Sequence, residues 1–409
     1  MTQKKLLTSL FDKINPENIN DYIKNNGYKA MHSALKMKST DIINEIIESG
    51  LKGRGGAGFP TGLKWKFVNE SPGDEKFVIC NADEGEPGTF KDRYIMEKNP
   101  HLFIEGIIIA SFAVGAKKAY IYIRGEYHKS IKIITHAIKQ AREKNLLGEN
   151  ILKTNFSLDI EIKKGAGSYL CGEELTLIES LEGKRGHPRI KPPFPAQVGL
   201  FNKPTLVNNV ETFANIPFII DKGTVEYRKF GKPNATGTKL FAVSGDVLKP
   251  GLIEVELGTK LKDIINFCGG FKNNNKPKAC LLGGAAGTFI PYEMFDITMD
   301  YDSLASEDLT MGSGAIIVLN ESRSIMSTLL SIMEFFQHES CGKCVPCRVG
   351  CTKIVEQLSN TIENNKQNDF IKIIEDAEYM KRNSLCPLGQ SPILPIKSAF
   401  RYFQEELIK

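Results

Sequence analysis

The stretch Cys341-Gly342-Lys343-Cys344-Val345-Pro346-Cys347-Arg348 places three thiols within seven residues, and a fourth follows in Ser384-Leu385-Cys386-Pro387-Leu388-Gly389. Three closely spaced cysteines with a distant fourth are typical of cubane iron-sulfur ligands, because the run holds one side of the cluster and the remote thiolate closes it. The spacing therefore predicts a metal cluster bound by Cys341, Cys344, Cys347 and Cys386. A protein with such a cluster transfers electrons.

Two alternatives to this ligand set remain open. Cys351 is a rival fourth ligand, but in two-cluster ferredoxins the fourth cysteine of such a run binds the other cluster, and only one run occurs here. Four thiolates also suit a structural zinc ion, although zinc cysteines usually come as two separate pairs. We therefore favour iron and Cys386, with zinc and Cys351 as the alternatives.

The residues around the cysteines, 322–409, have the apolar spacing of helices. Apolar side chains recur every three to four residues at Ile325, Leu329, Ile332, Met333 and Phe336; at Ile354, Val355, Leu358 and Ile362; at Phe370, Ile373, Ile374, Ala377 and Met380; and at Ile396, Phe400, Phe403 and Leu407. This spacing predicts a four-helix bundle. An antiparallel bundle brings the loop between helices one and two, and the loop between helices three and four, to the same end. Both cysteine segments therefore meet there.

Two further segments precede the helical one. Residues 1–235 alternate strand-like runs with helical stretches, a pattern that predicts an α/β sheet with crossover helices. The expected strands are Phe77–Ala82, Ala119–Arg124 and Leu158–Ile162, and the expected helices are Asp41–Ser49, Leu102–Val114, Lys129–Glu143 and Glu173–Leu181. Residues 236–321 read as a hairpin, a short helix and then more strands, which is the order of a small β-grasp module. We expect this module to serve packing or docking.

Composition narrows the class of protein. The 409 residues are 41% hydrophobic and 25% charged, with no apolar run near the ~18 residues that a membrane span needs. The polar first residues predict no signal peptide, so we expect a cytoplasmic protein without direct membrane insertion. Nine cysteines in a reducing compartment favour metal ligation or burial over disulfides. A net charge of +5 is too dilute for a nucleic-acid partner.

A glycine-rich run, Gly53-Arg54-Gly55-Gly56-Ala57-Gly58-Phe59-Pro60-Thr61-Gly62-Leu63-Lys64-Trp65, follows a predicted helix. Glycines allow backbone amides to approach an anion closely, while Arg54 and Lys64 supply positive charge, so the run is expected to bind a phosphate or a flavin. It is not a Walker loop, because Leu63 stands where that motif has lysine. A plain glycine turn is the alternative.

Acidic and amide residues gather at two further turns. Asp83, Glu84 and Glu86 follow the strand that ends at Ala82, and the carboxyl end of a strand in an open α/β sheet is where ligands bind. A solvated acidic loop and a set of acceptors for ribityl or ribose hydroxyls are equally compatible with this pattern. Glu173 and Glu174 begin a helix, where acids also suit the helix dipole. Alone, each turn is a weak signal.

Six motifs in fixed order resemble one family closely. They are the glycine run at Gly53, Asn81–Gly88, Cys171–Glu174, Lys191–Pro195, Asn208–Thr212 and Glu339–Arg348. Together they resemble the flavoprotein family of NADH-oxidising subunits. That family includes the FMN-binding subunit of respiratory complex I, the β subunits of NAD-linked and electron-bifurcating hydrogenases, and diaphorase subunits of formate dehydrogenases. The resemblance covers about Gly27 to Leu407.

The resemblance implies a Rossmann-like α/β domain that binds FMN and NADH (1–235), a ubiquitin-like β-grasp domain of the soluble-ligand-binding type (236–321) and a helical bundle with a [4Fe–4S] cluster (322–409). By motif, the FMN-lining residues would be Gly53, Arg54, Gly55, Gly56, Lys64, Asn81, Asp83, Glu84, Tyr169, Gly172, Glu173, Asn208 and Asn209. The NADH-binding residues would be Phe59, Phe67, Glu86, Glu174, Lys191 and Phe194. Carboxylates beside the ribose would repel the extra phosphate of NADPH, so NADH would be preferred.

The resemblance further implies an NADH dehydrogenase or diaphorase that passes a hydride to FMN and then single electrons to the cluster, with no side chain needed as acid or base. Its expected partners are a thioredoxin-like [2Fe–2S] small subunit and a larger iron-sulfur or hydrogenase-type subunit, with ferredoxin as a further candidate. Gln390 after Leu388-Gly389 favours the soluble hydrogenase branch, in which some members bifurcate electrons, over complex I or a formate dehydrogenase. A non-catalytic nucleotide-binding scaffold with structural zinc is the alternative of a different class.

Overall fold

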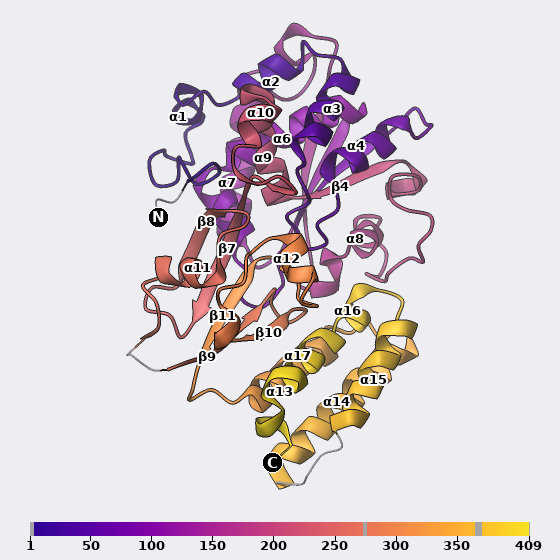
Figure 1. Cartoon of the computed structure of the whole chain (residues 1–409). Coiled ribbons are helices and arrows are strands. Elements are labelled where there is room, and N and C mark those ends of the chain that lie inside the picture. The colour runs from indigo at the N-terminus through magenta and orange to yellow at the C-terminus, as the bar shows by residue number, and fades with distance from the viewer. Residues whose placement is uncertain (1–3, 273–275, 365–369, 409) are drawn as a thin grey trace.

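The computed structural model describes residues 4–272, 276–364 and 370–408, so the first three of the polar N-terminal residues lie outside it. The chain forms an α/β segment, a segment with a second, five-stranded sheet and a helical C-terminal segment, which follow one another along the molecule (Figure 1). Three large buried cores correspond broadly to them, but the core of the C-terminal helices also includes Leu170 of the α/β segment and Leu281 and Phe289 of the second sheet. Within the described ranges, no helix is both long and apolar enough to cross a bilayer.

The α/β segment is built on a four-stranded parallel sheet in the order β3-β2-β1-β4. Its strands are β1 (Phe77–Ala82), β2 (Lys118–Ile123), β3 (Asp159–Lys164) and β4 (Thr205–Asn209). The first three strands were expected to within two residues, and the predicted α/β class is confirmed. The sequence did not predict β4, which pairs with β1 and brings Asn208 and Asn209 to its carboxyl end.

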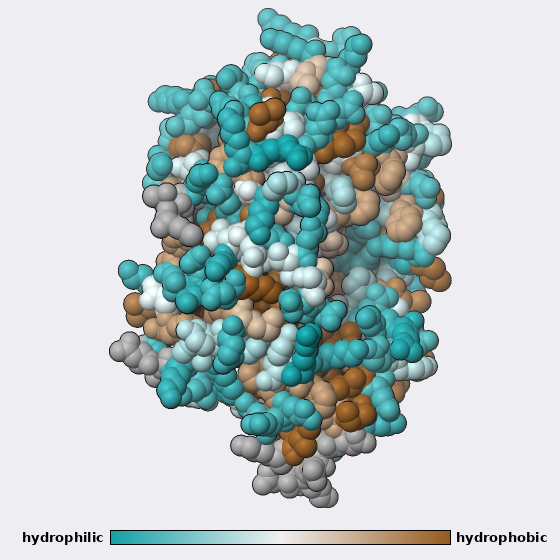
Figure 2. Space-filling view, in the orientation of Figure 1, coloured by the Kyte–Doolittle hydropathy of each residue, from teal (hydrophilic) through white to brown (hydrophobic). Residues whose placement is uncertain are grey.

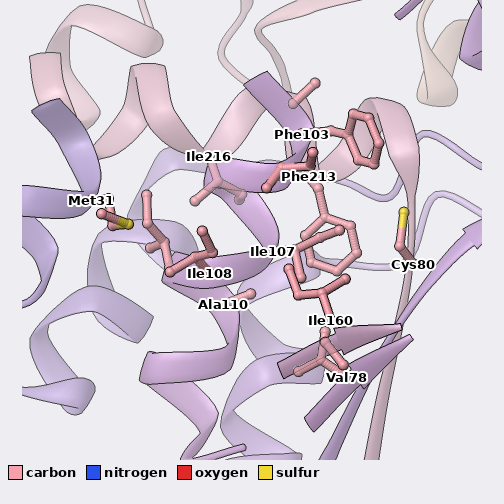
Figure 3. Close-up of a cluster of buried hydrophobic side chains, with 14 of the residues drawn as sticks. Met31, Val78, Cys80, Phe103, Ile107, Ile108, Ala110, Ile160, Phe213 and Ile216 are labelled. Carbon is pink, nitrogen blue, oxygen red and sulfur yellow. The ribbon is translucent and has the colours of Figure 1, made fainter. Parts of the chain in front are cut away.

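Helices cover this sheet and connect its strands. They are α1 (Ile19–Lys24), α2 (Lys29–Ala34), α3 (Ser39–Ser49), α4 (Thr61–Glu70), α5 (Lys91–Lys98), α6 (Pro100–Val114), α7 (His128–Glu143), α8 (Glu174–Leu181), α9 (Val210–Lys222) and α10 (Thr224–Tyr227). The 3-10 turn η2 (Tyr169–Gly172) precedes α8. Because α6 is apolar on nearly every side, it lies buried, and Ile107 packs with Phe213 of α9 beside Val78 of β1 (Figure 3).

The second sheet has five strands in the order β10-β9-β11-β7-β8. Its elements are β7 (Thr238–Gly245), β8 (Gly251–Glu256), α11 (Leu261–Phe267), β9 (Pro277–Leu282), β10 (Thr288–Pro291), α12 (Tyr301–Ala305) and β11 (Ala315–Asn320). A two-stranded ribbon of β5 (Gly231–Lys232) and β6 (Ala235–Thr236) precedes it. The first and last strands, β7 and β11, lie parallel and adjacent, whereas the other pairs are antiparallel. The expected hairpin and helix are present, and β10 is additional.

The C-terminal segment is helical, as expected. It contains α13 (Ile325–Glu339), α14 (Val345–Asn364), α15 (Phe370–Asn383), α16 (Pro387–Gln390) and α17 (Ile393–Leu407). α13 packs against α14 and α17, and α15 packs against the same two helices. The short α16, directly after Cys386, lies at the end of this segment nearest the α/β segment (Figure 1). Polar residues cover most of the visible face, and hydrophobic ones form small separate patches (Figure 2).

The close contact between α6 and α9 generates a stability prediction. A Cβ added at Gly106 would lie 2.0 Å from the Phe213 backbone oxygen, so the two helices would have to separate. Alanine gains up to about 1 kcal/mol of helix propensity, but overpacking typically costs about 1–3 kcal/mol. We expect Gly106→Ala to lower the midpoint of thermal unfolding. The control is Gly251→Ala, whose Cβ meets nothing within 4 Å. A Gly106→Ala protein as stable as the control would contradict this packing.

Candidate functional site

A cavity of about 1280 Å³ lies where the three segments meet. Its wall is formed by the glycine run after α3, the loop after β1, the turn η2, loops of the second sheet and the start of α16. Single small-molecule sites usually enclose about 300–1,000 Å³, so this cavity has room for more than one nucleotide-sized ligand. The carboxyl ends of β1 and β4 open into it, as expected for a ligand site in a parallel sheet.

The cavity brings together nearly all of the residues that the sequence singled out. Its lining includes Gly53, Gly55, Gly56, Phe59, Lys64, Phe67, Asn81, Asp83, Glu84, Glu86, Tyr169, Gly172, Glu173, Glu174, Lys191, Phe194, Asn208 and Asn209. These residues come from five stretches between positions 53 and 209, and their convergence makes one continuous site.

Arg54 is the exception among the predicted nucleotide-binding residues. Its side chain is buried outside the cavity wall and donates to the Thr236 carbonyl at 2.9 Å and to the hydroxyls of Tyr301 and Tyr227 at 3.3 and 3.4 Å. In this geometry its charge bonds to the protein itself, and a role of Arg54 at a bound anion stays a prediction. Because α10, β6 and α12 supply these partners, Arg54 ties the glycine run to residues that follow much later in the chain.

Several of the polar residues act as helix caps, which the sequence did not predict. The Glu173 carboxylate accepts from the amides of Leu175 and Thr176 at the start of α8. Asn209 Oδ1 accepts from the Glu211 amide at the start of α9, and its Nδ2 donates to Asp92 at 2.6 Å. These side chains bond mainly to the protein itself, so they set the shape of the cavity wall.

Asp83 has an unsatisfied carboxylate oxygen in the cavity wall. Its Oδ2 atom is buried without a hydrogen-bond partner. Burial raises the pKa of Asp83 to about 7, although the Arg124 guanidinium opposes this shift. Burial, followed by the nearby Asp92 carboxylate, likewise raises the pKa of Glu84 to about 7. An unpartnered buried acceptor is costly, and the raised pKa of Asp83 reflects this cost, because protonation removes the buried charge.

The outer part of the cavity is aromatic and cationic. Phe59, Phe67 and Phe194 are about half exposed there, at 45%, 49% and 52%. Beside them Glu174 lies between Lys64 at 3.0 Å and Lys191 at 2.9 Å. Burial opposes the ionisation of Glu174, but the two lysines together lower its pKa to about 2. Exposed rings next to balanced charges suit the stacking of a base and the binding of a sugar.

The cysteines of the C-terminal segment gather directly behind this cavity. Cys341 and Cys344 lie in the connection between α13 and α14, whereas Cys347 belongs to the first turn of α14 and is not in the loop. Cys386 precedes α16, and all four belong to or pack against one buried cluster. A Cβ added at Gly389 would lie 2.9 Å from the Cys347 Cβ, so the two cysteine segments are in contact as predicted.

The surroundings of these cysteines fit a cluster. Ser340 Oγ lies 3.3 Å from Cys347 Sγ, and the Ser384 hydroxyl is buried without a partner. Hydroxyl donors near the sulfurs are one of the features that tune the reduction potential of an iron-sulfur cluster. Among the residues that the structure describes, no three His, Cys, Asp or Glu side chains are grouped to hold a single metal ion. Because a cubane cluster contains several atoms, its four cysteine ligands lie farther apart than the ligands of a single ion.

Cys351 is buried on α14, one helical turn after Cys347. The choice between Cys386 and Cys351 as fourth ligand stays a prediction.

Sequence reasoning missed the contribution of the second sheet. Gly283, Ala286, Gly312 and Ser313 line the cavity, although this segment was expected to serve only packing or docking. The Ala286 amide donates to Glu86 at 3.1 Å, and the Ser313 hydroxyl pairs with Thr89 at 2.6 Å. The glycines near 283 and 312 were the available signal, since they allow backbone to approach a ligand.

Comparisons with known proteins agree with this arrangement. Residues 46–218 match the Nuo51 FMN-binding domain, residues 240–284 an SLBB domain, and residues 327–409 the NADH-ubiquinone oxidoreductase-F iron-sulfur binding region. The fold and the site thus define a flavin- and iron-sulfur-binding redox protein. The chain belongs to the family of NADH-quinone oxidoreductase F-type subunits and their hydrogenase relatives.

Three relatives illustrate the range of this family. The F-type subunit of the NADH-quinone oxidoreductase of Aquifex aeolicus is 48% identical, over 99% of this chain and 94% of its own. The NADP-reducing hydrogenase subunit HndC of Solidesulfovibrio fructosivorans is 43% identical, over 99% and 83%. A chain of a solved NAD+-reducing [NiFe]-hydrogenase superposes with a TM-score of 0.87 at 34% identity. This chain is covered over 99% of its length, but it spans only 66% of that hydrogenase chain.

The unpartnered Asp83 carboxylate generates a pH-dependent prediction. Its folded pKa of about 7 exceeds the ordinary value, so the folded state binds more protons between about pH 4 and pH 7, and ionisation costs stability as the pH rises through that window. Asp83→Asn removes this cost, up to about 4 kcal/mol at pH 8 by ~1.4 kcal/mol per pKa unit.

We therefore expect Asp83→Asn to raise the thermal unfolding midpoint of the cofactor-free chain more at pH 8 than at pH 5. The exposed Asp74→Asn is the matched control and should change little at either pH. An equal effect of Asp83→Asn at both pH values would contradict a protonated carboxyl in the wall.

Proposed function

We propose that this chain is an NADH:acceptor oxidoreductase subunit of the diaphorase type. FMN accepts a hydride from NADH when bound, and the [4Fe–4S] cluster passes single electrons to a partner. One observation carries the proposal. Leu170 lines the cavity and also packs in the same buried cluster as Cys347 and Cys386, so the nucleotide cavity and the cysteines share one wall.

The inner part of the cavity suits FMN. The glycine run supplies backbone amides for its phosphate, and Lys64 adds a cation. Asp83, Asn81 and Asn208 would supply acceptors and donors for the isoalloxazine and ribityl groups. The other residues predicted to line FMN, which are Glu84, Tyr169, Gly172, Glu173 and Asn209, would shape the cavity wall around it. Arg54 acts indirectly, by holding the glycine run in place.

The outer part suits NADH. Phe59, Phe67 and Phe194 would stack around the adenine, while Glu86 and Glu174 would accept from sugar hydroxyls, with Lys191 beside them. A carboxylate at the ribose disfavours the additional phosphate of NADPH. We therefore keep NADH as the preferred donor for this chain, although one relative is named an NADP-reducing hydrogenase subunit.

The proposed function implies three domains, with bounds at 1–235, 236–321 and 322–409. The second would be a ubiquitin-like β-grasp domain and the third a four-helix bundle. The three family matches follow one another along the chain in the same order, which supports this division. The partners would be a thioredoxin-like [2Fe–2S] subunit and a larger iron-sulfur or hydrogenase-type subunit in a cytoplasmic complex. Gln390 favours the hydrogenase branch, including its electron-bifurcating members, over the complex I branch. The iron-sulfur match disfavours a scaffold with structural zinc.

The first prediction of this function is spectroscopic. The purified holo-chain should be yellow-brown, with flavin absorption peaks and a broad iron-sulfur shoulder, and anaerobic NADH should bleach both. We expect both chromophores because the chain has a cavity for the flavin and, sharing a wall with it, the cysteines for the cluster. A colourless protein that contains zinc and does not respond to NADH would end the redox assignment.

The second prediction concerns the fourth ligand. Cys386→Ala should remove most of the ~4 iron atoms per chain that a [4Fe–4S] cluster contributes, because one corner of the cubane loses its thiolate. Cys351→Ala is the matched control, because Cys351 is also a buried cysteine and lies one helical turn after Cys347 on α14. This variant should leave the iron content unchanged. The measurement is iron and acid-labile sulfide per chain. The reverse pattern would make Cys351 the ligand.

A further inference from the structure

Glu339 holds the cavity wall to the cysteine segment. It is the last residue of α13, two positions before Cys341. Its Oε2 atom accepts a hydrogen bond of 2.9 Å from the backbone amide of Tyr169, which lies 170 residues earlier in the chain. A charged acceptor makes such a bond roughly twice as strong as a neutral one. The side chain is only partly exposed, which limits its screening by solvent.

Tyr169 is held from two other directions as well. Its ring packs edge-on against Phe335, one turn earlier on α13, with the ring centres 5.0 Å apart. Its hydroxyl donates to Glu86 Oε2 at 2.5 Å, and Glu86 in turn accepts from the Ala286 amide of the second sheet. The backbone, ring and hydroxyl of Tyr169 therefore join the three segments at one point.

The location of this junction connects it to electron transfer. Tyr169 and Leu170 line the cavity, and Leu170 packs in the core that contains Cys347 and Cys386. The distance and packing between a flavin in the cavity and a cluster behind the wall thus depend on where η2 is held. Several residues contact η2 in the described part of the chain. Of these, Glu339 is the closest in sequence to the cysteine run.

We infer that Glu339 is a positioning residue for the electron-transfer step between the flavin cavity and the cluster. It touches neither reactant and acts through the Tyr169 amide. Each NADH would supply two electrons to the flavin, of which the cluster could take one, and the other would stay on the flavin until an external one-electron acceptor oxidises the cluster. The inference rests on the proposed function, because it needs a flavin on one side of the wall and a cluster on the other.

Two substitutions separate the hydrogen bond from the charge. Glu339→Gln removes the charge and keeps an oxygen acceptor, whereas Glu339→Ala removes both. Any shift of the cluster potential caused by the lost charge should appear in both variants. We expect Glu339→Ala alone to slow NADH-driven cluster reduction several-fold, because the rate of electron transfer falls steeply as the distance between the flavin and the cluster grows. Flavin reduction by NADH should keep its rate, and Glu339→Gln should restore most of the cluster reduction.

The experiment is anaerobic stopped-flow mixing of the holo-chain with NADH, following flavin and cluster absorbance separately, with cluster potentials measured by redox titration. Glu334→Ala, an exposed residue on the same helix, is the control. If Glu339→Ala loses iron, Phe335→Leu, which loosens the Tyr169 ring contact, replaces it and should also slow cluster reduction.

The outcomes separate this inference from the function itself. A wild-type flavin that NADH does not reduce would refute the proposed function. The positioning role would be overturned by a different result. In that case NADH reduces both flavin and cluster in the wild-type protein, and an iron-replete Glu339→Ala or Phe335→Leu protein reduces its cluster at the same rate. Equal slowing by Glu339→Gln and Glu339→Ala would assign the effect to charge instead and would also overturn it.

Discussion

The packing of the turn η2 into the core of the helical segment is the contact on which the site depends. Leu170 is buried there with Cys347 and Cys386, while its neighbour Tyr169 faces the nucleotide cavity. Pro387 and Leu388, directly after Cys386, line the same cavity. The turn η2 and the start of α16 therefore contribute both to the cavity lining and to the core that contains the cysteines. The chemistry belongs to the cofactors, and the chain contributes their relative position.

Buried charges hold the second sheet against the α/β segment. Glu211, in the first turn of α9, is fully buried and pairs with Lys239 of β7 at 2.6 Å and with Lys91 at 3.1 Å. Burial lowers the pKa of Lys239 to about 8, although Glu211 opposes this shift. Charges removed from water are tolerated only when they are well paired, so this cluster specifies one arrangement of the two sheets. That arrangement brings Ser313 and Ala286 to the cavity.

Local pattern predicted the elements well, whereas their long-range roles needed the structure. Apolar periodicity predicted β1 and the four long C-terminal helices, and cysteine spacing predicted that Cys347 and Cys386 would meet. Motif order predicted the residues of the cavity wall. The inward role of Arg54 and the Glu339 bond to Tyr169 were not predictable, because each depends on a partner far away in the sequence. The capping by Asn209 is local, since its partner is the Glu211 amide two residues on, and the sequence analysis did not identify it. β4 was missed because a short strand that leads directly into a helix has little periodicity of its own.

The central claim is that one wall separates a flavin from a cluster bound by two cysteine segments. An anomalous difference map at the iron edge, from crystals of the FMN-loaded chain, tests it most directly. The account predicts one iron peak among Cys341, Cys344, Cys347 and Cys386, with flavin density across Leu170 in the cavity. An iron peak away from these sulfurs, or flavin density outside the cavity, would contradict it.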